Sequence, residues 1–324
     1  MHSIEETREY IEKSINNLEF NEEPKELYEP IRYVFGTGGK RLRPLMTLLA
    51  CNLFDEKLEG ALIPALGLEI FHNFTLLHDD IMDEADLRRN HPTVHKKWDQ
   101  NVAILSGDVM AILAYEYITS CDVKVLPDVI KVFNTTARQV CEGQQFDMNF
   151  EILTQVSVEE YLKMIEMKTS VLLAGCMQIG ALIGGASKKD AEFLYNFGRD
   201  IGMAFQIQDD LLDTYGDTEV FGKRIGGDIL ANKKTYLLIK ALERADEKQN
   251  NILNELINGS AVDPQDKIDA VKNIYNELEI KGLTNDLAGD YLKNALINLE
   301  KVEVPEERKV HLKQLADLLL NREK

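Results

Sequence analysis

The sequence is poor in helix-breaking residues and in cysteine. Its 324 residues include 8 prolines, 20 glycines and 4 cysteines. No stretch rich in Pro, Gly and Ser divides the chain, so we expect a single domain over residues 1–324. The cysteines stand far apart without a CxxC pair, which argues against a disulfide framework or a thiolate zinc site and favours a reduced, cytoplasmic protein. Residues 1–20 lack the apolar core of a signal peptide.

Positive charge and long apolar runs are also scarce. The chain carries 37 Lys and Arg against 55 Asp and Glu, a formal net charge of −18. Binding nucleic acid requires a surplus of cations, so we exclude nucleic acid as a partner. The most apolar stretch, residues 171–186, is shorter than the roughly 20 residues that a membrane span needs. We therefore predict a tightly packed core helix there, and no membrane span.

The dominant pattern is the spacing of apolar residues at i, i+3, i+4 and i+7. It begins in two short segments near residues 10–18 and 27–34. Longer segments follow, and they cover residues 58–83, 102–119, 127–150, 159–183 and 188–214, with a more polar tail over 236–320. No convincing run of alternating β-branched residues interrupts them. The pattern predicts an all-α bundle of ten or more helices, several of them buried on every side.

Two aspartate clusters lie on apolar helices, LLHDDIMD (76–83) and QIQDDLLD (206–213). Each spells DDxxD, and the six side chains are Asp79, Asp80, Asp83, Asp209, Asp210 and Asp213. The first and last aspartates of each motif are four residues apart, so their carboxylates share a helical face and repel each other. Carboxylate oxygens suit Mg²⁺, which completes its shell with water and substrate phosphates. One cluster is compatible with a surface accident, whereas two predict Mg²⁺ ions that clamp an anionic leaving group.

Cationic residues accompany the aspartates. GGKRLRP (38–44) places two glycines before three cations, and Arg88 and Arg89 follow the first aspartate motif. Arginine forks onto phosphate oxygens, and lysine supplies a point charge. Alone, each segment is weak evidence, since glycine followed by lysine is also common in surface turns. Beside two metal-binding motifs, both segments predict diphosphate binding.

In their order and spacing these motifs resemble those of the trans-isoprenyl diphosphate synthases, or polyprenyl synthetases. The matching segments are GGKRLRP (38–44), LLHDDIMD (76–83), RRNHPT (88–93), GQQFD (143–147), KT (168–169), QIQDDLLD (206–213), GK (222–223) and NKKT (232–235). The resemblance implies the isoprenoid synthase fold, with helices around a deep central cavity, and a homodimer. It also implies a Mg²⁺-dependent prenyltransferase that condenses isopentenyl diphosphate head-to-tail with dimethylallyl, geranyl or farnesyl diphosphate, releasing diphosphate.

The resemblance further implies roles for individual residues. Isopentenyl diphosphate would be held by Lys40, Arg43, His72 and Arg89. The allylic diphosphate would be held by Arg88, Lys168, Thr169, Gln206, Lys223 and Lys233. The leading Mg²⁺ ligands would be Asp79, Asp83 and Asp209, supported directly or through water by Asp80, Asp210 and Asp213. The catalytic set is these six aspartates with Arg88 and Lys168, which stabilise charge as diphosphate departs, so no side chain need act as a general base.

Helical geometry supports part of this assignment. At 100° per residue, His72 lies seven positions before Asp79 on the same face, and Gln206 lies three before Asp209. We therefore favour a ligand role for His72 over that of an ordinary core histidine. Asn90 and Asn232 stand where the family often has glycine. Because Asn tolerates a left-handed backbone better than most residues, we expect both loops to keep their shape.

Product length should depend on the side chains before the first aspartate motif. Phe71, Phe74 and Thr75 lie one or two turns before Asp79. Thr75 is small and lies along the carboxylate face, which disfavours the shortest pocket, whereas the two phenylalanines either close the pocket further down or are ordinary core residues. DDIMD also lacks the insertion that many short-chain bacterial-type farnesyl synthases carry. We expect geranylgeranyl diphosphate as the product, with farnesyl diphosphate as the alternative.

Two other classes share features with this sequence. A terpene cyclase has the all-α fold and the first DDxxD, but its second metal motif usually mixes Asn or Asp with Ser or Thr and Glu, and it lacks GGKRLRP. A non-catalytic subunit of a heteromeric synthase typically loses one aspartate motif. Both motifs are complete here, which favours the catalytic prenyltransferase.

Overall fold

The computed structural model describes residues 1–216, 225–259 and 263–320. In the first part of the chain the elements are α1 (Ile4–Asn16), α2 (Lys25–Gly36), α3 (Leu42–Asn52), α4 (Glu59–Met82), β1 (Leu87–Arg88), β2 (His91–Pro92), α5 (Val94–Lys97), α6 (Gln100–Ile118) and α7 (Leu126–Ile152). They are followed by α8 (Val158–Ile165), the π-helix η1 (Glu166–Ser170), α9 (Val171–Ile183), α10 (Lys188–Tyr215), α12 (Gly227–Leu230), α13 (Tyr236–Arg244), α14 (Glu247–Asn258), α15 (Pro264–Glu277), α16 (Ile280–Glu300) and α17 (Glu306–Leu320). The predicted all-α class is confirmed.

The chain groups into two compact units. Unit 1 comprises residues 1–134, 175–195 and 303–312. Unit 2 comprises residues 135–174, 196–302 and the chain from 313 onward. Four helices, α7, α9, α10 and α17, contribute residues to both units. The single domain expected over residues 1–324 stays a prediction.

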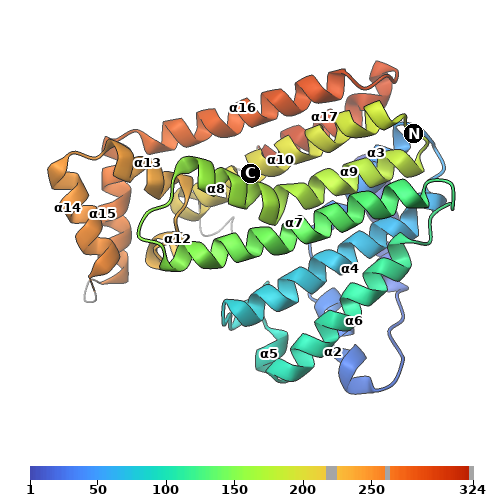
Figure 1. Ribbon diagram of the computed structural model, residues 1–324, viewed down its shortest axis with the longest axis horizontal. Coiled ribbons are helices and arrows are strands. Elements are labelled where there is room, and N and C mark those ends of the chain that lie inside the picture. Colours follow the sequence, from blue (N-terminus) through green and yellow to red (C-terminus); the bar gives the residue numbers. More distant parts are fainter. Residues whose placement is uncertain (217–224, 260–262, 321–324) are drawn as a thin grey trace. The chain divides into compact units, whose positions relative to one another are not determined.

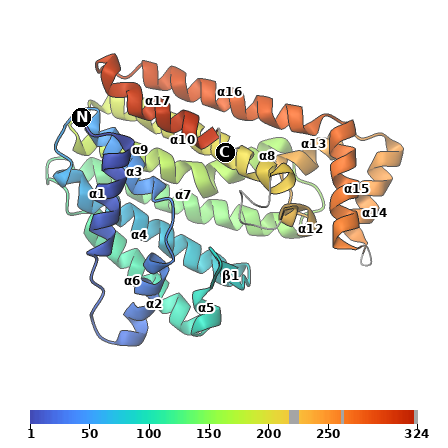
Figure 2. The same ribbon diagram turned by 180° about the vertical axis from the view of Figure 1, so that it is seen from behind.

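Unit 1 is built around α4, which packs against both α3 and α6. Figure 1 shows α4 and α6 running side by side, with α2 and α5 also against α6. On the other side, α1 lies against α3, as Figure 2 shows. The interior of α4 is apolar on most sides, and Leu68 and Ile70 are fully buried. This core helix carries the first aspartate motif at its C-terminal end.

The tightly packed helix predicted within residues 171–186 is α9, which ends at Ile183. A Cβ on Gly180 would lie 2.0 Å from the carbonyl oxygen of Thr47, and one on Gly184 would lie 2.7 Å from that of Cys51. Both neighbours belong to α3. Only glycine allows two backbones to approach this closely. The glycines in this apolar stretch therefore serve helix packing.

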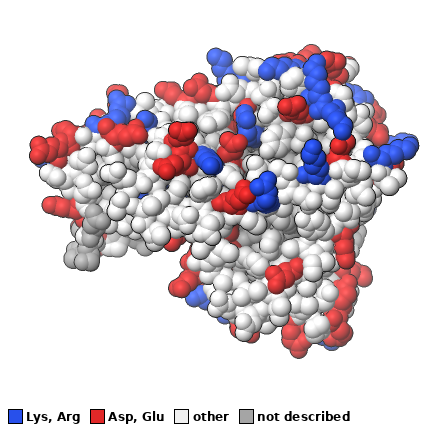
Figure 3. Space-filling view, viewed as in Figure 1, with Lys and Arg blue, Asp and Glu red and all other residues white. Residues whose placement is uncertain are grey.

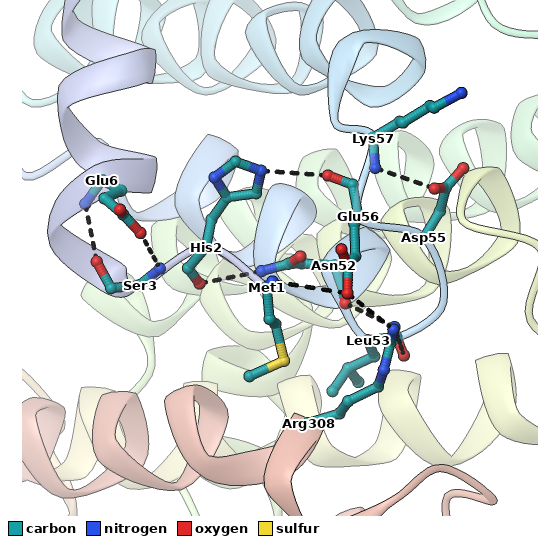
Figure 4. Close-up of polar contacts among 10 residues, drawn as sticks. All are labelled: Met1, His2, Ser3, Glu6, Asn52, Leu53, Asp55, Glu56, Lys57 and Arg308. Atoms are coloured by element: carbon teal, nitrogen blue, oxygen red, sulfur yellow. Dashed lines mark hydrogen bonds and ion pairs between the residues drawn. The ribbon is translucent and has the colours of Figure 1, made fainter.

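The N-terminus and a segment near the C-terminus are both joined to the loop after α3. Arg308 donates to the carbonyl oxygens of Asn52 and Leu53 at 3.4 and 3.0 Å, and pairs with Glu56 at 3.2 Å (Figure 4). The side-chain amide of Asn52 donates to the carbonyl oxygen of His2 at 3.0 Å. These contacts explain why a segment so late in the sequence belongs to unit 1.

Unit 2 contains two hydrophobic clusters. One is formed mainly by α13, α14 and α15, with Leu237 and Tyr275 among its buried residues, and Figure 1 shows α14 and α15 side by side. The other contains Tyr161 of α8 together with Met203 and Ile207 of α10. It joins α8 to α10, the helix that carries Gln206 and the second aspartate motif.

The apolar spacing predicts a helix over residues 159–183, and the chain is helical from Val158 to Ile183, but a π-helical segment interrupts the α-helix. The five-residue π-helix η1 separates α8 from α9. A π turn holds more residues per turn than an α turn and occurs frequently at functional sites. The apolar spacing continues on both sides of η1, so the sequence pattern alone does not reveal the interruption.

By length and composition alone, α4 and α6 are each long and apolar enough to cross a membrane. In α4, 61% of the apolar window is buried in the fold, as in a core helix, but in α6 the share is 33%. Leu105, Ile112 and Tyr115 of α6 are exposed. Figure 3 shows that the surface over α6 is mostly uncharged. Exposed apolar surface of this kind is typical of an interaction face.

Candidate functional site

The first aspartate motif lies at the C-terminal end of α4. Asp79 and Asp80 are in its last turn, and Asp83 caps it by donating its backbone N–H to the carbonyl oxygen of Asp79 at 2.8 Å. A helix C-terminus carries a partial negative charge, and the last turn of α4 contains no basic residue to offset it. Three carboxylates at the negative end of a helix dipole favour the binding of a cation.

Asp80 differs from the other two aspartates. Its side chain is buried, and Oδ1 accepts a hydrogen bond from Nε of Arg88 at 2.7 Å. Burial raises the pKa of Asp80, and the charge of Arg88 opposes this rise. Asp79 is half-buried and Asp83 is exposed. The motif is therefore divided between one inward carboxylate held by the protein and two that reach solvent.

A short hairpin presents Arg88 and Arg89 near the end of α4 (Figure 2). Strand β1 pairs antiparallel with β2, and the residues of the turn, Arg89 and Asn90, have φ angles of 53° and 64°. Two successive positive φ angles characterise a type I′ turn. The prediction that Asn90 tolerates a left-handed backbone is confirmed. Tyr33 of α2 fixes the hairpin by donating its hydroxyl to the carbonyl oxygen of Pro92 at 2.8 Å.

The glycine pair of GGKRLRP contacts Arg89. Nη1 of Arg89 donates to the carbonyl oxygen of Gly38, and a Cβ on Gly39 would lie 2.8 Å from that nitrogen. Both glycines have positive φ angles, 78° and 147°. A side chain at position 39 would displace the guanidinium, so the pair is required for packing as well as for the turn. The structure thus brings the two cationic segments together, with Lys40 exposed in the same turn.

Arg41 and Glu69 form a buried ion pair at the start of α3, and the sequence pattern did not predict this pair. Arg41, which is 5% exposed, donates from Nη1 to Oε1 of Glu69 at 3.1 Å and from Nη2 to the carbonyl oxygen of Phe35 at 2.8 Å. Glu69 is the lone charged residue in the interior of α4, and a charge isolated on an apolar helix is the sequence feature that could have revealed the ion pair.

Buried atoms without a hydrogen-bond partner among the described residues include Oε2 of Glu69, Oδ1 of Asn73 and Nε of Arg43. Orphaned buried polar atoms are typical of a site that takes a ligand or water.

His72 lies in an arginine cluster, which consists of Arg41, Arg43, Arg88 and Arg89. Burial lowers the pKa of His72 well below its ordinary value, and the charges of the cluster lower it further. Burial also lowers the pKa of Arg43, against the influence of Glu69. His72 is therefore a neutral imidazole near neutral pH, able to donate or accept a hydrogen bond without adding charge. The sequence-predicted residues Arg43, His72, Arg88 and Arg89 are brought together here.

The three residues predicted to set product length lie on α4 in or beside a cluster of aromatic rings. The ring centroid of Phe71 is 5.6 Å from that of Phe74 and 5.2 Å from that of Phe133. Tyr115 of α6 extends the cluster, with its ring edge-to-face with that of Phe133 at 4.9 Å. Phe71 is buried and Phe74 is half-buried, so Phe74 is the better placed to face a ligand. The Thr75 hydroxyl donates to the backbone carbonyl of the preceding turn.

In unit 2, the π-helix η1 presents Lys168 and Thr169. Nζ of Lys168 lies 2.5 Å from Oδ2 of Asp147, the aspartate of the GQQFD segment. The glycine of the same segment, Gly143, allows the close approach, because a Cβ there would lie 2.2 Å from the backbone nitrogen of Lys168. The matching segments GQQFD and KT are therefore adjacent in space, and the ion pair with Asp147 orients the side chain of Lys168.

The second aspartate motif contains a buried aspartate as well. Asp210 is 4% exposed, and its Oδ2 accepts a hydrogen bond from the Tyr161 hydroxyl at 2.6 Å. Its Oδ1 accepts from Nε2 of Gln206 at 2.9 Å, and the Thr169 hydroxyl in turn donates to Oε1 of Gln206 at 3.1 Å. Burial raises the pKa of Asp210 to about 7. Asp209 beside it is half-buried. Tyr161 was not predicted as a site residue.

The last aspartate of this motif holds a backbone turn. Oδ2 of Asp213 accepts from the backbone N–H of Asp228 at 2.9 Å, and its carbonyl oxygen accepts from the N–H of Gly226 at 2.7 Å. Asp228 was not predicted as a site residue. It pairs with Lys233, whose Nζ lies 3.8 Å from Oδ1 of Asp228. Asp228 is thus held by Asp213 through its backbone N–H and pairs with Lys233 through its carboxylate.

Lys233 lies under the influence of several carboxylates, although its side chain is 41% exposed. Burial lowers its pKa, but the aspartates raise it more, so the net shift is upward. The carboxylates responsible are those of Asp228, Asp210, Asp147 and Asp209. These carboxylates favour Lys233 over Lys234 as the lysine that faces the site. Asn232, the residue before Lys233, has the left-handed φ of 53° that we expected. Lys223, the other lysine predicted here, lies outside the described residues.

The aspartates offer oxygen ligands to a divalent cation. Within the part of the chain that the structure describes, no three His, Cys, Asp or Glu side chains are grouped as a metal site on their own. Mg²⁺ needs only one or two protein carboxylates, because water and phosphate oxygens complete its shell. Asp79 and Asp83 in unit 1 and Asp209 in unit 2 supply oxygen donors of the required kind.

Comparison with known proteins identifies close relatives over the whole chain. The family model described as Polyprenyl synthetase matches residues 24–278. A geranylgeranyl diphosphate synthase of Methanosarcina mazei is 38% identical over 330 residues, which cover 99% of this chain and 97% of that protein. A crystal structure of a geranylgeranyl pyrophosphate synthase superposes with a TM-score of 0.95 at 41% identity, covering 100% of both chains. A geranylgeranyl pyrophosphate synthase from Corynebacterium glutamicum, solved with isoprenyl diphosphate and magnesium, has a TM-score of 0.86 at 27% identity, covering 98% of both chains.

The depressed pKa of His72 makes stability depend on pH. Its folded pKa lies below the ordinary value of about 6.5, so the unfolded chain binds more protons than the folded one between these two values. The contribution is fully present above pH 6.5 and is lost as the pH falls, by up to about 1.4 kcal/mol per pH unit. We expect H72Q to flatten the fall in unfolding free energy between pH 6.5 and 5.5, measured by urea denaturation. The exposed-site variant H91Q should keep the wild-type slope, and an unchanged slope in H72Q would contradict the assignment.

Proposed function

The chain belongs to the polyprenyl synthetase family and is a prenyltransferase, and on that premise we propose that it makes geranylgeranyl diphosphate. In this reaction isopentenyl diphosphate condenses head-to-tail with an allylic diphosphate, which is dimethylallyl, geranyl or farnesyl diphosphate, and diphosphate is released. The observation that carries the proposal is that each DDxxD motif has cations of its own unit nearby, Arg88 paired with Asp80 and Lys233 under the influence of Asp209 and Asp210. Farnesyl diphosphate is the alternative product.

We propose that Mg²⁺ is the divalent cation, bound by Asp79, Asp83 and Asp209. Bound Mg²⁺ would neutralise the charge that develops on the departing diphosphate. The oxygen donors fit this ion, and the relative from Corynebacterium glutamicum was solved with magnesium. Asp80 and Asp210 are proposed to support these ligands from inside the protein, because their oxygens already accept hydrogen bonds from Arg88, Tyr161 and Gln206.

We propose that the side chains of unit 1 hold isopentenyl diphosphate. Arg43 and Arg89 supply charge, Lys40 adds a third cation, and His72 supplies a hydrogen bond as a neutral imidazole. The orphaned Nε of Arg43 is a donor still available for a phosphate oxygen. Its guanidinium is supported by the negative charge of Glu69, so the site does not depend on ligand alone to balance its positive charge.

We propose that Arg88, Lys168, Thr169, Gln206 and Lys233 hold the allylic diphosphate, with Lys223 as a further cation. In the structure Lys168 and Lys233 are each paired with an aspartate. Phosphate oxygens would exchange with those carboxylates as partners. As the carbon–oxygen bond breaks, these cations stabilise the leaving diphosphate, and the double bond of isopentenyl diphosphate attacks the allylic cation. The proton that is then lost passes to the released diphosphate, so no side chain is assigned as a general base.

The first test is turnover by the purified protein. With Mg²⁺, isopentenyl diphosphate and farnesyl diphosphate, we expect release of diphosphate and a twenty-carbon product on chromatography. The same chromatogram separates geranylgeranyl from farnesyl diphosphate when dimethylallyl diphosphate is the primer. Absence of turnover with every allylic primer would refute the proposed function, and a cyclised hydrocarbon would indicate a terpene cyclase. A D79N variant is the matched control, and it should lose at least a hundredfold in rate.

We propose that Phe74, with Phe71 and Thr75, limits the length of the product. Phe74 is half-buried and its tilted ring contacts that of Phe71 with centroids 5.6 Å apart, while Phe71 packs edge-to-face against Phe133. The packed ring of Phe71 thus supports one side of the bulky Phe74 ring. Removing it opens space without removing the ring behind it.

We expect F74A to lengthen the product by one or more isoprene units, because the growing chain is no longer stopped at that ring. Product chain lengths are measured by chromatography after dephosphorylation. The matched control is F193A, which truncates a half-buried phenylalanine of unit 1 that contacts Lys189 and should leave the product unchanged. An F74A product identical to the wild type would exclude Phe74 as the limit.

We propose that the protein is a cytoplasmic homodimer that uses α6 in its interface. Leu105, Ile112 and Tyr115 are 57%, 60% and 42% exposed on that helix. Their spacing places them near one side of the helix, where a second copy would bury them. A partner copy is favoured over a membrane because Asp108 is exposed within the same stretch.

We expect sedimentation analysis to show a dimer for the wild type at micromolar concentration and a monomer for I112D. Aspartate at this position would leave a charge buried in the interface. The control L318D changes an exposed leucine of α17 and should remain dimeric. A wild-type monomer, or a dimeric I112D, would contradict the assignment of α6, and binding of the wild type to lipid vesicles would favour a membrane instead.

A further inference from the structure

Tyr161 is a buried tyrosine with no role in the reaction as described so far. It lies on α8, one turn after the capping box formed by Ser157 and Glu160, which fixes where the helix begins. The side chain is 1% exposed, and its ring belongs to the buried cluster that also contains Met203 and Ile207. The ring is therefore fixed by packing, and the position of its hydroxyl follows from the position of the ring.

The hydroxyl donates to Oδ2 of Asp210 at 2.6 Å, within the ordinary range for an O–H···O hydrogen bond. The other carboxylate oxygen accepts from Gln206 at 2.9 Å. A carboxylate that accepts from both sides inside a packed cluster has one orientation. Gln206 is itself oriented, since its Oε1 accepts from the Thr169 hydroxyl. A chain of hydrogen bonds thus runs from Thr169 of η1, through Gln206, to Asp210 and Tyr161.

The register of α10 separates Asp210 from the other aspartates of its motif. At 100° per residue, Met203, Ile207 and Asp210 lie within about 60° of one another, on the side that faces the cluster. Asp209 is turned about 100° away from Asp210, and Asp213 lies close to the direction of Asp209. One aspartate of the motif therefore enters the apolar cluster, and the Tyr161 hydroxyl is the donor that meets it there.

We propose that Tyr161 is a positioning residue for the second metal motif. It holds Asp210 as an internal anchor, and this anchor fixes the rotation of α10 and thereby the direction of Asp209. In this arrangement Asp210 is not a direct metal ligand, although it is adjacent to one. The proposal rests on the proposed function for the identity of the substrates, but its central measurement is of metal binding and does not require turnover.

The test is the variant Y161F in the full-length chain, with Mn²⁺ as the probe. Free Mn²⁺ is counted by electron paramagnetic resonance, which gives the Kd without substrate. Loss of a residue that orients a metal ligand typically weakens metal binding 10- to 100-fold, and we expect the Kd for Mn²⁺ to rise by about tenfold. The KM for the allylic diphosphate should rise with it, while the KM for isopentenyl diphosphate stays within a factor of two.

The matched control is Y275F, which removes a hydroxyl from another buried tyrosine of unit 2. It should change neither the Kd nor either KM. An unchanged Kd in a folded Y161F would overturn the proposal. So would an equal rise in Y275F, because general loosening of unit 2 would then explain both. A wild type that binds Mn²⁺ but gives no product would refute the proposed function while leaving the role of Tyr161 open to this same measurement.

A second comparison does not depend on Y161F being folded. If Asp210 is an anchor and Asp209 is a ligand, D209N should weaken Mn²⁺ binding by at least tenfold more than D210N. Equal losses in the two variants would make Asp210 a ligand and overturn the proposal. In the double variant Y161F/D210N, the loss should not exceed that of D210N, because both substitutions act on one interaction. Multiplied losses would mean that Tyr161 acts elsewhere.

Discussion

Repulsion among neighbouring carboxylates is the constraint on which the rest of the site depends. At the end of α4 three aspartates face the negative end of the helix dipole, with no basic residue in the last turn to offset it. In unit 2, the charges of four aspartates act on Lys233. Such groups are unfavourable unless some of the charge is removed or compensated. The protein does so with Arg88, Tyr161 and Gln206, each of which donates to one inward carboxylate.

Helix geometry explains why the inward carboxylate is the second of each pair. Adjacent residues on a helix differ in direction by about 100°, so two consecutive aspartates cannot both face one ligand. On α4, Asp79 shares a face with His72, while Asp80 is turned toward Arg88 and is buried. On α10 the same step turns Asp210 into the hydrophobic cluster. On α4 and α10 alike, DDxxD thus turns its second aspartate inward as an anchor, about 100° from the first.

The sequence predicted those parts of the fold and site that depend on local spacing. The helices, both DDxxD motifs and the left-handed Asn90 and Asn232 follow from periodicity or from residue type, whereas the grouping of His72 with the arginines is implied by the family resemblance. Arg41, Glu69, Tyr161 and Asp228 were not found, because their partners are distant in the sequence. A buried tyrosine looks like ordinary core until its acceptor is known. The π-helix η1 was missed because apolar spacing continues on both sides of it.

Local compensation also explains how a chain with a net charge of −18 can recognise an anion. Net charge acts over distances that salt screens, whereas a diphosphate responds to the groups within a few ångströms. In unit 1 those groups are arginines gathered around a neutral imidazole, with Glu69 as the internal counter-charge. Like charges held together by the fold favour a ligand of opposite charge, because binding relieves their repulsion. The arginine cluster thus favours an anion for the same reason that the aspartate motifs favour a cation, and each unit holds both kinds of group.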